Sequence, residues 1–466
     1  MNTAAASEAP STPAWSLAAG APPRLAAGSI RERDRDGLRP GAPRNSAPWE
    51  TRPAPELLAL RTQVMRQMAH WSAAVDRLAD RTAFAAPSSW EALESYLGVA
   101  LRGSLDDAVA RLRAQASSVR SELVAARTFA EFEAVRRRLV DFRKRYLQAE
   151  TLVTFYAHAV SSRTSPQISA LLRACDAIAV AAMTPVLSAG GLPTPPVLVY
   201  VDKGLGASIL RAGLRLWDGG TTSPVAAIKV VWHNLLRPTA LCHEAGHQAA
   251  FAVGWNEQLA HTLAGVDRVV GEEWAGWASE IAADAVAFVT TGYGAVAALH
   301  DVLAGEETPV FLGVPGDVHP SSWLRVLLGV AMCRHSFGSG PWDDLGDAWV
   351  SAHALRRAPL GVRPLLERSR ELLPEIASLV LRTRYPCFAG RNLTEIVDPE
   401  HVRPHSLTEW QEQVGPALWT SPRWLVEEPL RLLALSSYLI ATDPARSSEL
   451  VTQLQDWMTS LGQLHI

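Results

Sequence analysis

The chain has 466 residues, of which 48% are hydrophobic and 20% are charged, and its formal net charge is -3. This composition is typical of a globular protein with a large buried core. The near-neutral charge argues against nucleic acid or an anionic membrane as the main partner. The 4 cysteines lack paired spacing, which excludes a disulfide framework and a cysteine-based zinc site.

Residues 1–52 are rich in Ala, Pro, Ser, Gly and Arg and show no periodicity, which predicts a disordered tail. The segment lacks a basic start followed by an apolar run, so we expect no standard secretion signal. We also expect no membrane span, because the best apolar run, 177–187, is too short and contains Pro185. A cytoplasmic location follows, with non-classical export left open.

Residues 53–190 are predicted to form an N-terminal helical bundle. Ser104 is expected to cap one helix, and Thr128 with Glu131 forms the pattern of a capping box at the start of another. Apolar residues then recur at helical spacing from Phe132 to Val153. A further helix is expected to begin at Pro166 and to end at the glycine pair 190–191.

Two short runs rich in β-branched residues, Val197–Val201 and Val225–Trp232, predict strands of a small sheet packed on the helix that follows. Residues 191–340 are therefore expected to form a separate unit with a sheet. Beyond Pro341 the pattern returns to helices up to the end, so 341–466 is predicted to be a C-terminal helical domain. The fold class expected is mostly α with a small β-sheet.

The most informative motif is H-E-x-x-H, formed by residues 243–247. On a helix, His243 and His247 lie four residues apart on one face, the spacing that binds one Zn²⁺ ion. Glu244 then lies beside the metal, where it can accept a proton from water. The alternative is a pair of buried histidines satisfied by hydrogen bonds alone. Pro238 and Gly254 are expected to bound this helix.

A second apolar segment, 274–284, carries Glu280 and Asp284 four residues apart on one helical face. Two carboxylates in such surroundings are costly unless a cation lies between or beside them. We therefore expect Glu280 to be the third metal ligand. Asp284 is expected to accept a hydrogen bond from the distal nitrogen of a ligand histidine.

H-E-x-x-H followed by E-x-x-x-D on a second helix resembles the gluzincin branch of zinc metallopeptidases, over residues 225–288. The resemblance implies a zincin-like α+β catalytic unit, flanked here by N- and C-terminal helical regions. It also implies that the strand before the motif helix, Val225–Trp232, binds an extended substrate by β-augmentation. The metzincin pattern fits worse, because Gln248 and two alanines follow the motif.

Three residues are candidates to stabilise the oxyanion of a tetrahedral intermediate: His319, Arg325 and Tyr293. His319 precedes an apolar helix and could instead cap it, and Arg325 could be a surface charge. Tyr293 follows the helix of Glu280 and could be an ordinary loop aromatic. The sequence leaves these alternatives open.

The sequence favours a zinc-dependent metallopeptidase, a hydrolase that acts on a peptide or protein substrate with Glu244 as general base. Two alternatives remain. One is a zinc hydrolase of a non-peptide amide or ester. The other is a non-catalytic helical interaction protein on a zincin fold, although such a protein has no need of Glu244. An effector delivered into another cell is a further possibility that the tail permits. The sequence does not indicate the oligomeric state.

Overall fold

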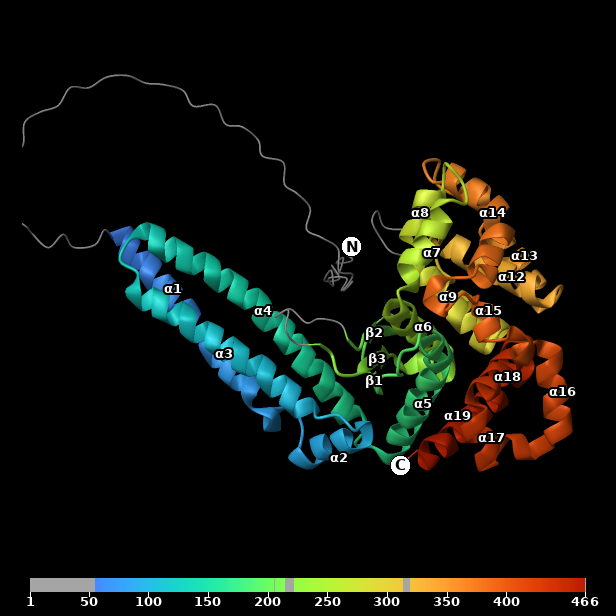
Figure 1. The fold of residues 1–466 in the computed structure, drawn as a ribbon, viewed down its shortest axis with the longest axis horizontal. Coiled ribbons are helices and arrows are strands. Elements are labelled where there is room, and N and C mark those ends of the chain that lie inside the picture. Colours follow the sequence, from blue (N-terminus) through green and yellow to red (C-terminus); the bar gives the residue numbers. More distant parts are fainter. Residues whose placement is uncertain (1–54, 205, 214–221, 313–318, 466) are drawn as a thin grey trace, which may run out of the picture. The chain divides into compact units, whose positions relative to one another are not determined.

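A computed structural model describes residues 55–204, 206–213, 222–312 and 319–465. These residues are predominantly helical and include one small sheet, which confirms the expected fold class (Figure 1). The tail expected at residues 1–52 lies outside the described residues.

The first hydrophobic core is built by helices that precede residue 163. They are α1 (Pro55–Ala79), α2 (Pro87–Leu97), α3 (Leu101–Ala125) and α4 (Phe129–Ser162), and the three long ones pack side by side (Figure 1). The predicted capping box at Thr128 and Glu131 is confirmed, since each side chain bonds the other residue's backbone amide. The apolar stripe predicted from Phe132 to Val153 is buried in this core.

The prediction that Ser104 caps a helix is wrong, because α3 begins three residues earlier, at Leu101. The Glu94 side chain at the end of α2 accepts a hydrogen bond of 2.6 Å from the backbone amide of Arg102. An acceptor from the preceding helix thus satisfies a free amide in the first turn. Glu94 lies eight residues before Arg102, so a local capping pattern at the start of α3 could not have revealed this acceptor.

Helix α5 (Pro166–Ala189) starts and ends where the sequence predicts. It is the one helix in the described part of the chain that is long and apolar enough to cross a membrane. However, 61% of its apolar window is buried inside the protein, as expected of a core helix. The 177–187 run is therefore only part of a longer buried helix.

The sheet contains β1 (Val197–Val201), β2 (Ser208–Leu210) and β3 (Ala226–Val230) in the order β1-β3-β2. β3 pairs in parallel with β1 and antiparallel with β2. The expectation that Val225–Trp232 offers an exposed strand edge is therefore wrong, because β3 is hydrogen-bonded on both sides. In the described part of the chain β1 and β2 are the edge strands, and β2 is the nearer of the two in sequence to the motif helix. With only three residues, β2 is too short to be predicted from a sequence pattern.

Alternate residues of the sheet face two different hydrophobic cores. Leu198 and Tyr200 join the core of α1–α4, whereas Val197 and Val199 join the core built around α5. Because successive strand residues point to opposite faces, one short strand serves both cores. The sheet thus lies between the helical bundle and the helices that carry the candidate site.

The second core gathers α5 and the helices that follow the sheet. Up to residue 340 these are α6 (Ala240–Val253), α7 (Trp255–Ala264), α8 (Gly271–Gly276), α9 (Ala278–Thr291), α10 (Tyr293–Leu303), α11 (Glu307–Phe311) and α12 (Ser322–Phe337). The rest are α13 (Pro341–Ala352), α14 (Arg363–Arg382), α15 (Leu393–Ile396), α16 (Pro404–Val414), α17 (Pro422–Glu427), α18 (Pro429–Thr442) and α19 (Ser447–Leu464). One hydrophobic cluster spans α5 to α19, so the predicted boundaries at 190 and 340 both fall within it.

A buried ionic cluster joins the two cores. Asp176 on α5 accepts hydrogen bonds from Arg163 at 2.7 and 2.8 Å, from the backbone amide of Val199 at 2.6 Å and from the Tyr96 hydroxyl at 2.9 Å. These partners come from α2, from the end of α4 and from β1. One carboxylate thus links both cores through the sheet.

Replacing Asp176 with alanine should lower the free energy of unfolding by about 3–5 kcal/mol, because the buried Arg163 guanidinium loses its counter-ion. Urea denaturation followed by circular dichroism measures this change. The control is Asp141→Ala, which removes an exposed pair with Lys144 and should change stability little. Equal effects of the two substitutions would contradict a special role for Asp176.

Candidate metal centre

The two helices that carry the polar motif residues, α6 and α9, pack in close contact. Gly246 allows this approach, because a Cβ atom at this position would lie 2.9 Å from both the Cα and the carbonyl oxygen of Ala283. The lack of a side chain at Gly246 therefore sets the distance between the two helices at this point. That distance decides whether a side chain of α9 can reach the histidines of α6.

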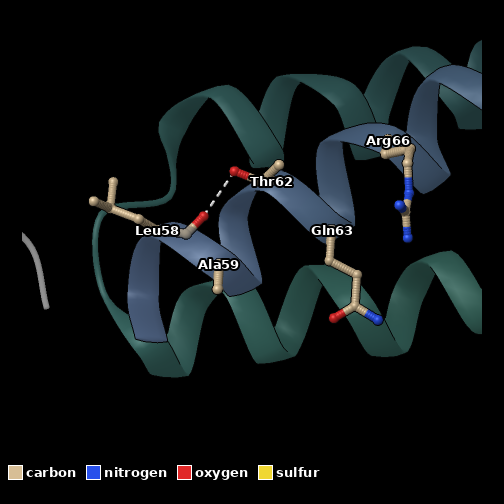
Figure 2. Close-up of a pocket in the computed structure, with 5 residues that line it drawn as sticks. All are labelled: Leu58, Ala59, Thr62, Gln63 and Arg66. Atoms are coloured by element: carbon tan, nitrogen blue, oxygen red, sulfur yellow. Dashed lines mark hydrogen bonds between the residues drawn. The ribbon is translucent and has the colours of Figure 1, made fainter. Parts of the chain in front are cut away.

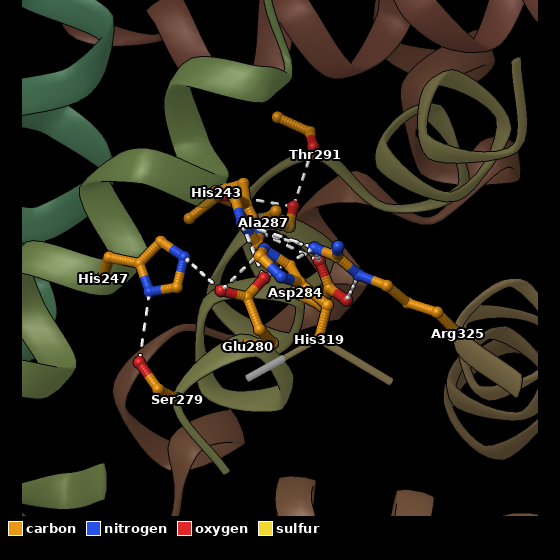
Figure 3. Close-up of polar contacts among 10 residues, drawn as sticks. His243, His247, Ser279, Glu280, Asp284, Ala287, Thr291, His319 and Arg325 are labelled. Atoms are coloured by element: carbon orange, nitrogen blue, oxygen red, sulfur yellow. Dashed lines mark hydrogen bonds and ion pairs between the residues drawn. The ribbon is translucent and has the colours of Figure 1, made fainter. Parts of the chain in front are cut away.

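Glu280 reaches both histidines of the motif (Figure 3). Its Oε1 lies 3.2 Å from Nε2 of His247, and its Oε2 lies 3.5 Å from Nε2 of His243. The three ligand atoms lie within 4.8 Å of one another. Bonds of about 2.1 Å to a tetrahedral ion place ligand atoms roughly 3.4 Å apart. The cluster can therefore hold a metal ion, as the sequence predicted.

The other ring nitrogen of each histidine also has a partner. Asp284 Oδ1 lies 2.8 Å from Nδ1 of His243, and the Ser279 hydroxyl lies 3.3 Å from Nδ1 of His247. Such partners hold each ring with Nε2 turned toward the Glu280 carboxylate. The position of Asp284 is the one expected for a carboxylate behind a ligand histidine. Ser279 was not predicted, although it is the polar residue next to Glu280 in an apolar segment.

Arg325 on α12 is buried and contacts the acidic side of the cluster. It donates to Asp284 at 2.6 Å from Nε and 2.8 Å from Nη2, and Nη2 lies 3.2 Å from Glu280 Oε2. The alternative of a surface charge is therefore wrong. Because Nε and Nη2 are bonded to Asp284, the guanidinium holds that carboxylate in place.

The charges of the buried side chains favour a cation at the cluster. Glu244, Glu280 and Asp284 are three buried carboxylates, whereas the positive charges beside them are the buried Arg325 and, in the metal-free protein, the protonated His243. Oε2 of Glu280 is fully buried and accepts no hydrogen bond of acceptable geometry from any described residue. The nitrogens of His243 and Arg325 are near it but poorly aligned. A buried acceptor left unsatisfied costs about 1–3 kcal/mol, which a bound cation removes.

The pKa values reflect this crowding of charges. Burial by itself lowers the pKa of His243, but Asp284 and Glu280 outweigh it and raise that pKa to about 10. Burial raises the pKa of Asp284, but Arg325 and His243 outweigh it and hold the pKa at about 2. Burial likewise raises the pKa of Glu280, but the nearby His243, His247 and Arg325 side chains outweigh it and keep the pKa well below the usual range.

Glu244 and His319, two further residues predicted for the site, lie in different surroundings. Glu244 is 6% exposed, and its carboxylate has no hydrogen bond or ion pair with any described residue. His319 is half exposed, with Nε2 3.4 Å from Glu280 Oε1, so it lies at the solvent side of the cluster. The helix cap of α12 is Ser321, not His319.

Tyr293 has no contact that supports a role at the cluster. It begins α10 and is 4% exposed, with its ring packed against Trp342 and Tyr438 in the second core. The loop-aromatic interpretation is also wrong, since the residue is helical. Among the described contacts, none joins its hydroxyl to the His243, His247 and Glu280 group.

Gln248 and Arg211 are two polar residues near the cluster for which the sequence predicted no role. The Gln248 amide bonds the backbone of Ala212, accepting from its nitrogen at 2.8 Å and donating to its oxygen at 3.4 Å. This contact ties the end of β2 to α6 and places Arg211 beside the motif helix. The only local sign of this contact in the sequence is that Gln248 is polar and directly follows His247 in a mostly apolar helix.

A separate open depression lies on α1 (Figure 2). Leu58, Ala59, Thr62, Gln63 and Arg66 line it. The lining residues include no carboxylate, histidine or thiol. The depression therefore offers no metal ligand and no general base.

Comparisons with protein-family models, with curated proteins and with solved structures gave no match.

Replacing Gly246 with alanine should weaken metal binding at least tenfold, because the new methyl group forces α9 and Glu280 away from the histidines. Overpacking of this kind costs about 1–3 kcal/mol. Isothermal titration of the purified, metal-free protein with Zn²⁺ measures the affinity. The control is Gly103→Ala on α3, where a Cβ atom meets nothing within 4 Å. Unchanged affinity in the Gly246 variant would show that helix spacing does not govern the cluster.

Metal binding should release the proton of His243, whose pKa of about 10 keeps the ring protonated at neutral pH in the metal-free protein. The apparent affinity should then rise about tenfold per pH unit between about pH 7 and pH 9. Calorimetry in two buffers with different ionisation enthalpies counts the protons released.

Asp284→Asn removes the carboxylate that raises the pKa of His243, so it should flatten this pH dependence. It should also weaken binding at alkaline pH by about 10–100-fold. Asp76→Asn, which alters an exposed pair with Arg113, is the control. A variant that keeps the wild-type pH dependence would contradict the assignment of the released proton.

Proposed function

We propose that the chain is a zinc-dependent metallopeptidase of the gluzincin type. The observation that carries the proposal is the Glu244 carboxylate, which is buried on the motif helix and has no bonded partner among the described residues. A purely structural metal site requires no such group. General-base catalysis requires a carboxylate beside the three-ligand cluster that is free to accept a proton from water.

The donor set favours zinc. Two imidazole nitrogens and one carboxylate oxygen form a ligand set typical of catalytic zinc, with a fourth position open to solvent. A bound zinc ion supplies Lewis-acid chemistry, which polarises a substrate carbonyl and makes water nucleophilic near neutral pH. The exposed side of His319 marks the direction from which a substrate would approach.

In this proposal each residue has one task. Glu244 takes a proton from the attacking water and then passes it to the leaving nitrogen of the substrate. His319 donates a hydrogen bond to the oxyanion that forms at the substrate carbonyl. Asp284 and Arg325 keep the His243 ring in place while the charge on the substrate changes.

A peptide is favoured over a small ester or amide by the position of β2. This strand is at the sheet edge in the described part of the chain and packs near α6. An edge strand beside the cluster can hold an extended peptide backbone by β-augmentation. The edge proposed for this purpose is thus β2, in place of Val225–Trp232.

Glu244→Gln should abolish hydrolysis and retain zinc, since glutamine keeps the shape but cannot accept the proton. The assay measures cleavage of a mixed peptide library by mass spectrometry, together with the zinc content of the protein. Glu272→Gln, on the exposed face of α8, is the matched control and should keep both properties.

The other outcomes select other functions. Cleavage of small esters or amides but of no peptide would favour a non-peptide hydrolase. Zinc bound by wild type without hydrolysis of any substrate class would favour a non-catalytic interaction protein. Loss of zinc together with activity in the Glu244 variant would indicate that this residue supports the metal site itself.

A further inference from the structure

Arg211 follows β2 directly and lies on the face of the sheet that the motif helix covers. Ala207 and Ile209 pack against the core of α5 and α6, whereas Leu210 packs against the core of the bundle. Strand residues alternate between faces, so Arg211 shares the side of Ile209. The bonds between Gln248 and Ala212 hold this part of the chain against α6.

The Arg211 guanidinium is placed next to the face of α6 that carries the histidines. Its Cζ lies 5.1 Å from the centroid of the Phe251 ring. Phe251 follows His247 by four positions and His243 by eight, so the three side chains lie along one helical face. The guanidinium is therefore about one helical turn beyond His247 on the same side of the helix.

No carboxylate of the described residues lies within ion-pair distance of Arg211, although the side chain is partly buried. Burial lowers the pKa of Arg211, while attraction from Glu280, Glu244 and Glu257 opposes this effect. These acids are close enough to act on the guanidinium, yet none lies within ion-pair distance of it. A divalent ion would balance the three buried carboxylates together with Arg325. Arg211 then remains as an additional positive charge near the cluster.

We propose that Arg211 binds a carboxylate of the substrate next to the metal cluster, so that the favoured substrates are peptides with a carboxylate near the bond that is cleaved. This inference rests on the proposed peptidase function and adds a substrate class to it. Guanidinium and carboxylate pair through two parallel hydrogen bonds, which selects this group over neutral ones. The carboxylate comes either from the C-terminus of the peptide or from an acidic side chain.

Binding of three matched peptides to the Glu244→Gln protein tests the proposal without turnover. The probes are a short alanine–leucine peptide with a free C-terminus, the same peptide with a C-terminal amide, and the amide with one glutamate. Isothermal titration measures each dissociation constant with zinc and without it. The metal-free measurement separates Arg211 from direct binding of a carboxylate to the ion.

One carboxylate peptide should bind about 10–100-fold more tightly than the neutral amide, a ratio typical of a hydrogen bond to a charged group. Preference for the free C-terminus or for the glutamate peptide shows whether the carboxylate that binds Arg211 comes from the peptide end or from an acidic side chain. Arg211→Ala should remove the preference in the metal-free protein and reduce it in the zinc form, and Arg211→Lys should retain part of it. Arg423→Ala, which removes an arginine that stacks on Trp424 at 5.0 Å, should retain all of it.

Equal binding of all three peptides, a preference that survives Arg211→Ala in the metal-free protein, or no binding of any probe would overturn the proposal. Circular dichroism and zinc affinity of the Arg211→Ala protein establish that a lost preference is not a loss of folding. A preference that depends on Arg211, in a wild-type protein that cleaves none of the peptides, would leave the anion site in place and reject the peptidase. Cleavage that ignores the carboxylate would reject only the role of Arg211.

Discussion

The close approach of α6 and α9 is the constraint on which the candidate site depends. At Gly246 the motif helix has no side chain, and the backbone of α9 at Ala283 occupies the space that a Cβ atom would need. Glu280 lies one turn before Ala283, so this contact brings its carboxylate to the two imidazoles. A Cβ atom at Gly246 would therefore push the two helices, and with them the candidate ligands, apart.

Once the helices are in contact, the acidic side chains need support of their own. Asp284 and Glu280 lie on the same face of α9, and their mutual repulsion in a buried setting is offset by His243 and Arg325. Arg325 comes from α12, so a third helix completes the cluster. Its charge holds Asp284 ionised, and ionised Asp284 in turn fixes the ring of His243. The geometry of the candidate ligands thus depends on a buried arginine that is not itself one of them.

The small sheet connects this site with the rest of the chain. Its two faces belong to different hydrophobic cores, and Asp176 joins them through Arg163 and the backbone of Val199. The end of β2 is attached to α6 through Gln248, which places Arg211 near the cluster. In the described part of the chain, the sheet thus connects the helical bundle with the helix that carries the motif.

Local signals in the sequence were sufficient for several elements. The capping box at Thr128, the proline at the start of α5 and the glycine at the end of α6 each act within a few residues of the chain, so their outcome could be predicted. The i, i+4 spacing of His243 with His247, and of Glu280 with Asp284, is likewise a local property of a helix. It was enough to predict which side chains share a face.

Local signals did not predict three features of the fold. These are the order of the strands, the contacts of Ser279 with His247 and of Gln248 with Ala212, and the position of Arg211. Each depends on which distant segments pack together, and this is decided by side-chain volume and by the pairing of backbone groups across the fold. Ser104 illustrates the same limit, because an acceptor from the preceding helix replaced the local cap. The sequence by itself determined the ligand residues of the candidate site and the faces on which they lie. Only the tertiary structure decided that these faces meet, because the contact between Gly246 and Ala283 exists only when both helices are packed.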